Sequence, residues 1–207
     1  MFKLLVINYI FSMIIIVKID GYFVYGDGDF SHSLDDVDDY SQYQLVFVSR
    51  TEWKALATNK PFEKLDIIPA PYVMIYHTGT ETCFYFEACA AILRRMQAQY
   101  MVSYPGDRDI GFNFVVSGDG SVYVGRGWNT VGAHTLGLNR KSIGIALIGT
   151  FYDKSPSANQ IFALINLIKF GVHDHLIDKE FKYYSYPAIS SIFTADKLAN
   201  ITYIMEP

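Results

Sequence analysis

Charge is scarce in this 207-residue chain, because Asp, Glu, Lys and Arg make up only 18% of it and the net charge is −4. The only clustered bases, Arg94 and Arg95, fall within an amphipathic helical pattern. The sequence therefore has no stripe of basic residues that would neutralise a phosphate backbone. We expect no nucleic-acid partner.

Cysteine is scarcer still. Cys83 and Cys89 are the only two, so they can pair with none left over, and such a disulfide persists in an oxidising compartment. Paired cysteines are not nucleophiles, and the chain also lacks a Gly-x-Ser-x-Gly elbow. Neither cysteine nor serine hydrolase chemistry is supported.

Hydrophobic residues, in contrast, make up 51% of the chain. That fraction is too high for a disordered protein, and the length suits one domain with some additional sequence. An apolar run from Leu4 to Val17, with Lys3 before it and Lys18 after it, falls short of the ~20 residues that span a bilayer. We interpret residues 1–26 as a secretory signal peptide. The alternative is an uncleaved signal anchor, because apolar residues continue beyond Lys18.

Residues 27–43 are rich in Asp, Ser and Gly and have no repeating apolar face. They are predicted to form an acidic, flexible linker, because their spacing lacks the Gly turn and distal Glu of a calcium loop. Near the other end, Asn200-Ile201-Thr202 is an acceptor sequon for N-glycosylation. Secretion is thus the expected localisation, with membrane anchoring through the N-terminal segment as the alternative.

From residue 44 onward, strand and helix patterns alternate. Strands are predicted at 72–77, 112–116, 122–126, 142–148 and 178–186, and helices at 83–100, from 157 onward and at 194–203. Asp119-Gly120 supplies a hairpin turn, and Ser157 with Gln160 forms a capping box. The pattern predicts an α/β domain over residues 44–207, with a central mixed sheet flanked by helices.

Several short motifs occur in an order that carries a family resemblance. They are Val-Ser-Arg-Thr-Glu-Trp at 48–53, Pro-Tyr-Val-Met-Ile-Tyr-His-Thr at 71–78, the two cysteines, Asp-Ile-Gly-Phe-Asn-Phe at 109–114, Gly-Asp-Gly at 118–120, Gly-Arg-Gly-Trp at 125–128, Gly-Ala-His at 132–134 and Lys-Ser-Ile-Gly-Ile at 141–145. In this order the chain resembles the peptidoglycan recognition proteins. The resemblance implies the amidase-like fold shared with phage lysozymes, with a groove for the stem peptide and sugar of peptidoglycan.

Catalytic members of that family, the resemblance implies, cleave the bond between the sugar's lactyl group and the stem peptide with a zinc held by two His and one Cys. Such a site needs three protein ligands and one open position. At the corresponding positions this chain has Tyr76, Tyr186 and Thr194, whose neutral hydroxyls are poor zinc ligands. Phe112 replaces the family's catalytic Tyr. We expect no metal, no cofactor and no amidase activity.

No other histidine is expected to rebuild the metal site. Adjacent strand residues point to opposite faces of a sheet, so His77 cannot take the place of residue 76. His173 and His175 diverge at a helix end and are interpreted as exposed residues favoured by the helix dipole.

The resemblance also assigns positions that line or border the ligand cleft: His77, Thr78, Phe112, Arg126, Trp128, Asn129, Thr130 and His134. Phe112 and Trp128 have an alternative interpretation as core aromatics. Arg126 lies in a Gly-Arg-Gly-Trp motif that receptors of diaminopimelate-type peptidoglycan also have, where a guanidinium can fork onto the extra carboxylate. The alternative is that Arg126 ends a strand and pairs with Asp119.

Two function hypotheses follow. In the first, the protein is a non-catalytic pattern-recognition protein that binds bacterial peptidoglycan or muropeptides in innate immunity. In the second, it is a regulatory protein or co-receptor that has lost peptidoglycan binding and pairs with another member of the family. An active zinc amidase is the third hypothesis, and the replaced ligands argue against it.

Overall fold

The computed structural model describes residues 15–19, 22–26, 43–58, 61–103, 109–185 and 202–203. The chain divides into two compact units, Met1–Gln42 and Tyr43–Pro207. In the first unit, β1 (Ile15–Ile19) pairs antiparallel with β2 (Tyr22–Gly26). Both strands lie in the segment predicted as a signal peptide, and cleavage of that segment stays a prediction. The linker prediction falls almost wholly outside the described residues.

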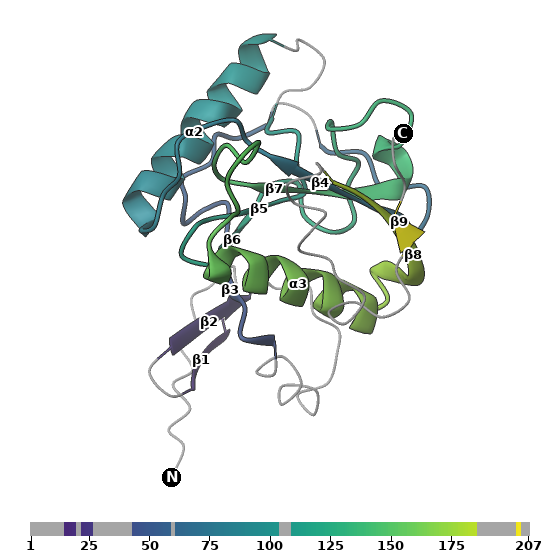
Figure 1. Ribbon diagram of the computed structural model, residues 1–207, viewed down its shortest axis with the longest axis horizontal. Coiled ribbons are helices and arrows are strands. Elements are labelled where there is room, and N and C mark those ends of the chain that lie inside the picture. The colour runs from purple at the N-terminus through teal and green to yellow at the C-terminus, as the bar shows by residue number, and fades with distance from the viewer. Residues whose placement is uncertain are drawn as a thin grey trace. The chain divides into compact units, whose positions relative to one another are not determined.

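The second unit is built on a mixed seven-stranded sheet in the order β3-β6-β5-β7-β4-β8-β9. The strands are β3 (Val46–Val48), β4 (Ala70–His77), β5 (Phe114–Val116), β6 (Ser121–Val124), β7 (Ser142–Leu147), β8 (Ile177–Ser185) and β9 (Thr202–Tyr203). The pairs β4–β7, β4–β8 and β5–β7 are parallel, whereas β5–β6 is an antiparallel hairpin. The expected mixed α/β sheet is confirmed (Figure 1).

Helix α3 (Ala158–His173) covers one face of the sheet (Figure 1). Ser157 caps it by accepting a hydrogen bond from the Gln160 N–H, as the capping box predicts. The reciprocal half of the box is absent, because the Gln160 amide instead donates to the carbonyls of Val116 and Ile148. The first turn of the helix is thereby joined to β5 and to the residue that follows β7.

Helix α2 (Phe86–Ser103) covers the opposite face (Figure 1). Cys89, Ile92, Leu93 and Met96, at the helical spacing of one face, are buried, and Tyr100 on the same face is half-buried against them. The helix begins at Phe86 and not at Cys83, because the Cys83 carbonyl accepts the Gly118 N–H of the hairpin turn. The predicted disulfide between Cys83 and Cys89 is present and fixes the start of the helix.

The predicted closing helix over 194–203 is wrong in its last part. Thr202–Tyr203 is strand β9, which pairs parallel with Lys182 and Tyr183 of β8. β-branched and aromatic residues favour a sheet edge once a partner strand is available. Tyr186, Thr194 and Asn200, which carry two of the predicted ligand replacements and the predicted glycosylation site, lie outside the described residues.

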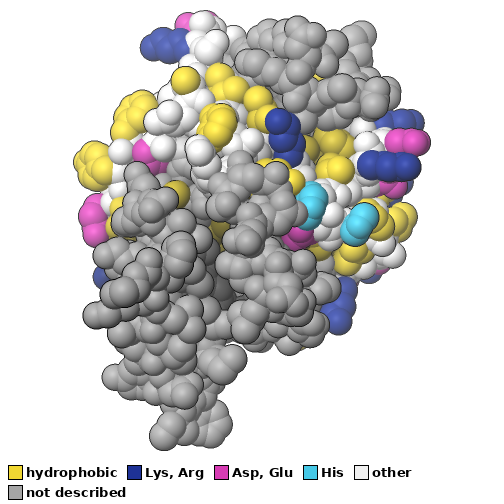
Figure 2. All heavy atoms as spheres, turned by 90° about the horizontal axis from the view of Figure 1, so that it is seen from below, with side chains coloured by type: hydrophobic (Ala, Val, Ile, Leu, Met, Phe, Trp, Pro, Cys, Tyr) yellow, Lys and Arg dark blue, Asp and Glu magenta, His cyan; other side chains and the backbone are white. Residues whose placement is uncertain are grey.

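Within the part of the chain that the structure describes, no helix combines the length and the apolar character needed to cross a bilayer. Figure 2 shows one face of the molecule, on which the described acidic and basic side chains are interspersed among hydrophobic ones. On this face the described basic side chains do not gather into a stripe.

Candidate functional site

Tyr76 lies on the face of β4 that is covered by α2, and it is surrounded by other rings. Its ring centroid is 5.9 Å from that of Phe112, 6.2 Å from His134 and 6.1 Å from Tyr184. We call these four residues the aromatic floor. Phe112 is buried, and its ring stacks on His134 at an interplanar angle of 10°. The predicted replacement of a zinc ligand and the predicted replacement of the catalytic Tyr thus lie side by side.

The hydroxyl of Tyr76 is engaged in a chain of hydrogen bonds. It lies 2.7 Å from Thr135 Oγ1, which in turn lies 2.9 Å from His134 Nδ1. Burial is the main reason that the pKa of His134 falls to about 3, with a smaller contribution from the charge of Arg126, so the imidazole is neutral at physiological pH. The ring fits because residues 132 and 144 are glycines, where a Cβ would overlap the imidazole.

The donor chemistry around the aromatic floor does not fit a three-ligand zinc site. Tyr76 is the one predicted ligand position that the structure describes, and its neutral phenol is already hydrogen-bonded to Thr135. Among the described residues, no group of three or more His, Cys, Asp or Glu is placed to hold a metal ion. Both cysteines are in the disulfide. A zinc site would therefore need donors from outside the described residues.

Arg126 lines a pocket of about 720 Å³, to which the 131–139 segment also contributes lining residues. Its Nε donates to the Ile110 carbonyl at 2.8 Å, and its Nη1 donates to the Val131 carbonyl at 3.0 Å. The guanidinium carbon lies 5.3 Å from the centre of the Phe62 ring, a distance suited to a cation–π contact. Asp119, the predicted alternative partner, accepts instead from Ser117 Oγ and the Ser121 N–H within the hairpin turn.

The pocket carries charges of both signs. Its lining residues include Thr58, Phe62, Glu63, Asp66, Arg126, Val131, Gly132, Leu136, Asn139, Arg140 and Lys141. Arg140 forms ion pairs with both Glu63 and Asp66, and the hydrogen bond from Arg140 lowers the pKa of Asp66. The Lys141 ammonium lies over the Tyr72 ring at 5.5 Å. With three bases and two acids the lining is net cationic, and the pocket suits an anionic group.

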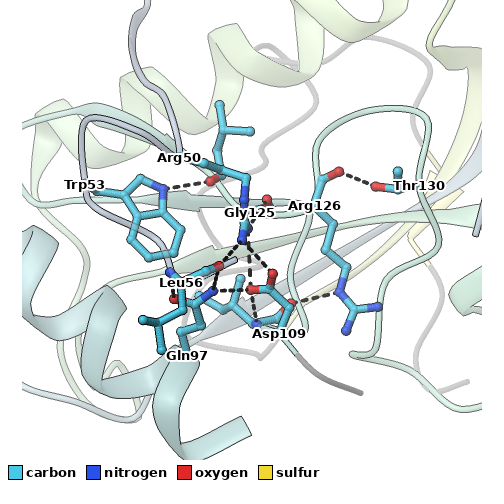
Figure 3. A network of polar contacts seen from close by, with 10 residues as sticks. Arg50, Trp53, Leu56, Gln97, Asp109, Gly125, Arg126 and Thr130 are labelled. Atoms are coloured by element: carbon cyan, nitrogen blue, oxygen red, sulfur yellow. Dashed lines mark hydrogen bonds and ion pairs between the residues drawn. The ribbon is translucent and has the colours of Figure 1, made fainter. Parts of the chain in front are cut away.

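A buried ion pair holds the backbone on which Arg126 rests (Figure 3). Asp109 is completely buried and accepts from Arg50 Nη2 at 2.6 Å and from Gln97 Nε2 at 2.9 Å. Its carboxylate also accepts the Ile110 N–H, while Arg50 Nη1 donates to the Gly125 carbonyl at 2.8 Å. Residues 110 and 125, on either side of the Arg126 side chain, are therefore fixed by one carboxylate and one guanidinium.

The other predicted site residues separate into two groups. Thr130 Oγ1 donates to the Arg126 carbonyl, and the exposed Asn129 precedes Thr130 in sequence, but neither residue lines the pocket. Trp128 does not join them. It packs against the core on the α3 side, with its ring centroid 4.4 Å from that of Phe114 and 5.9 Å from that of Phe170. These contacts agree with the alternative interpretation of Trp128 as a core aromatic.

His77 and Thr78 lie where β4 ends, apart from the pocket lining. His77 Nδ1 accepts the Phe151 N–H at 3.0 Å, so in the neutral ring the proton is on Nε2. Burial lowers the pKa of His77. Thr78 Oγ1 accepts the Gly149 N–H, which joins the ends of β4 and β7.

Sequence reasoning missed Thr135, Phe62, Tyr184 and the Arg50–Asp109 pair. Thr135 and Tyr76 are 59 positions apart, as are Arg50 and Asp109, so no local pattern marks either contact. Asp109 begins the Asp-Ile-Gly-Phe-Asn-Phe motif, and the position of its carboxylate next to apolar Ile110 was the only sequence signal of a buried charge.

Comparison with known proteins gives a consistent result. Residues 68–194 match the family model described as N-acetylmuramoyl-L-alanine amidase. Peptidoglycan-recognition protein LE of Drosophila melanogaster is 40% identical over 139 residues, which are 66% of this chain but only 39% of that protein.

Two solved structures are similar as well. The crystal structure of peptidoglycan recognition protein-LE in complex with tracheal cytotoxin, a monomeric diaminopimelic acid-type peptidoglycan, superposes with a TM-score of 0.63 at 38% identity and covers 67% of this chain and 80% of that one. The ectodomain complex of peptidoglycan recognition proteins LCa and LCx, bound to the same toxin, gives a TM-score of 0.69 at 33% identity, with 76% and 99% covered.

Proposed function

The chain belongs to the peptidoglycan recognition protein family, whose domain is that of N-acetylmuramoyl-L-alanine amidase, and on this premise we propose that it binds bacterial peptidoglycan without cleaving it. The observation that carries the proposal is the pair formed by Tyr76 and Arg126. The first removes a ligand that amidase chemistry requires, and the second retains a cationic group at a pocket. Recognition is thus separated from catalysis.

Zinc amidase chemistry sets requirements that the residues of this chain do not meet. The metal must be held by three protein ligands so that the pKa of its water falls to about 7. Tyr76 is a neutral phenol in a hydrogen-bond chain, and Phe112 has no hydroxyl to offer a tetrahedral intermediate. Tyr186 and Thr194, from the sequence, remove the other two ligands.

Charge and space at the pocket both favour binding. A pocket of about 720 Å³ has room for a stem-peptide side chain, and Arg126 is held there by two backbone carbonyls and the Phe62 ring. The stem types differ by one carboxylate, which a guanidinium recognises through charge-assisted hydrogen bonds. We propose that the diaminopimelate type is preferred, and that the protein is a secreted component of innate immunity.

A second candidate function is regulatory. Tyr76 and Tyr184 pack together in the aromatic floor, where a phenol stands in place of the family's first zinc ligand. The similar solved structure of LCa and LCx is a complex of two family members with tracheal cytotoxin bound to it. A chain of this fold that no longer bound peptidoglycan would act through such a partner.

Calorimetric titration with diaminopimelate-type and lysine-type muropeptides separates the two candidates. We expect Arg126→Thr to weaken the diaminopimelate ligand roughly ten- to more than a hundredfold, because a charge-assisted hydrogen bond contributes ~1.5–3 kcal/mol. Affinity for the lysine type should change little. Arg95→Thr, at an exposed arginine on α2, is the matched control and should bind like wild type. Equal losses for both ligands would remove Arg126 as a specificity determinant, and no binding by wild type would favour the regulatory role.

A further inference from the structure

The 131–139 segment, which we call the wall loop, contributes His134 to the aromatic floor and also lines the pocket. Val131, Gly132, Leu136 and Asn139 line the pocket from this segment. Asn139 Oδ1 accepts the N–H groups of both His134, at 2.9 Å, and Thr135, at 2.7 Å, so the middle of the loop is folded around its own side chain. The loop is thus folded on itself, and its attachments to neighbouring elements hold it in place beside the pocket.

On the floor side, Tyr76 provides such an attachment. Its hydroxyl reaches Thr135 Oγ1 at 2.7 Å, and Thr135 is only 7% exposed, so water does not readily replace this contact. Thr135 Oγ1 also lies 2.9 Å from His134 Nδ1. A side chain of β4 is thus joined to two consecutive residues of the wall loop.

The environment of His134 Nε2 decides which atom donates in each of these hydrogen bonds. His134 Nε2 is buried and has no hydrogen-bond partner among the described residues. A buried N–H without an acceptor is more costly than a buried lone pair, so we assign the proton to Nδ1. Nδ1–H then donates to Thr135, and the Thr135 hydroxyl donates to the Tyr76 oxygen. The Thr135 hydroxyl proton thus has one place in this series of hydrogen bonds, and the contact with Tyr76 is directional, with the Tyr76 oxygen as the acceptor.

The wall loop reaches Arg126 through its first residue. The Val131 carbonyl accepts from Arg126 Nη1 at 3.0 Å, and the Val131 N–H donates to the Glu63 carbonyl beside Phe62. A displacement of the loop would shift one of the two carbonyls that orient the guanidinium. The geometry points to Tyr76 and Thr135 as positioning residues: their hydrogen bond, at a position where the family places a metal ligand, holds the wall loop so that Arg126 faces the pocket. This inference rests on the proposed function in so far as the pocket binds an anionic muropeptide.

Four variants of the full chain test the inference. Tyr76→Phe removes the hydroxyl and keeps the ring, Thr135→Val removes the other hydroxyl, Thr135→Ser keeps it, and the double variant closes a double-mutant cycle. Tyr85→Phe, at a residue that is 67% exposed, is the control for loss of a phenol. Calorimetry uses the diaminopimelate-type muropeptide, and hydrogen exchange by mass spectrometry follows residues 131–139.

We expect Tyr76→Phe and Thr135→Val each to weaken binding about three- to tenfold, the range for one buried hydrogen bond. The double variant should lose no more affinity than either single variant. Thr135→Ser should bind like wild type, and exchange in the wall loop should quicken in Tyr76→Phe and Thr135→Val alone. A merely structural role would predict lower melting temperatures with unchanged affinity.

Unchanged affinity in both hydroxyl-deleted variants, or additive losses in the double variant, would overturn the inference. If wild type binds no muropeptide, the proposed function fails, and the exchange measurement decides the inference by itself: faster exchange confined to 131–139 supports it, and unchanged exchange refutes it. If Tyr76→Phe does not fold, the comparison of Thr135→Val with Thr135→Ser supplies the same test.

Discussion

Neutralising Asp109 should destabilise the fold far more than neutralising a carboxylate in an ion pair of the same length at the surface. Asp109 pairs with Arg50 at 2.6 Å, and the two side chains are 0% and 25% exposed. Glu81 pairs with Arg95 at the same 2.6 Å, but there the two side chains are 60% and 58% exposed. The two pairs differ mainly in burial, so Asp109→Asn and Glu81→Gln form a matched comparison.

The magnitude for Asp109 follows from what the carboxylate accepts. Its oxygens receive hydrogen bonds from Arg50, Gln97 and the Ile110 N–H, and an Asn amide would place a donor against one of these donors. Breaking a buried pair costs about 3–5 kcal/mol, and we expect the lower end, about 3 kcal/mol, because Arg50 keeps partial exposure and two carbonyl acceptors.

Thermal unfolding followed by circular dichroism measures this difference. For a domain of this size a loss of about 3 kcal/mol corresponds to a decrease of roughly 6–12 °C in melting temperature. Glu81→Gln should have the same melting temperature as wild type, because an exposed ion pair is screened by solvent. Equal decreases in the two variants, or no decrease for Asp109→Asn, would refute the claim that this buried pair anchors the backbone beneath Arg126.

Two further predictions concern the wall loop and the disulfide. The pKa of His134 falls from an ordinary value near 6.5 to about 3 on folding, so the unfolded chain binds more protons between these values and stability is lost as pH falls below 6.5. Chemical unfolding should show that His134 contributes about 2 kcal/mol less to the unfolding free energy at pH 5 than at pH 7.5. His134→Gln should therefore make the unfolding free energy depend less steeply on pH. Equal pH dependence in the variant and wild type would contradict the lowered pKa of His134. Replacing Cys83 and Cys89 together with Ser should lower the unfolding free energy by about 2 kcal/mol, the loop-closure value for a six-residue separation, and free thiols found by mass spectrometry in secreted wild type would refute the disulfide.

Local patterns predicted the fold well because they need only neighbouring residues. Helix α3 begins where Ser157 caps it, and its apolar stripe packs on the sheet as its helical spacing predicts. The strand at Tyr76 and the hairpin around Gly120 follow from the same kind of evidence. The closing helix failed at Thr202, because pairing with β8 is a tertiary contact that the sequence does not display.

The site was harder to predict, because its contacts join distant segments. The family motifs located Arg126 and Tyr76, but the partners of their side chains, Val131 and Thr135, are set by how loops fold over the sheet. Trp128 lies only two residues after Arg126, but it packs against the core, and the chain between them turns at Gly127, where φ is 75°. Motif membership therefore indicated the region and not the direction of each side chain.

Incubation of the purified chain with insoluble diaminopimelate-type peptidoglycan, in the presence of added zinc, tests the central claim most directly. After centrifugation, the pellet is assayed for bound protein and the supernatant for released stem peptide, with a catalytically active family member as the positive control. We predict protein in the pellet and no stem peptide in the supernatant. Stem peptide whose release stops on addition of a chelator, or a pellet without protein, would contradict the account.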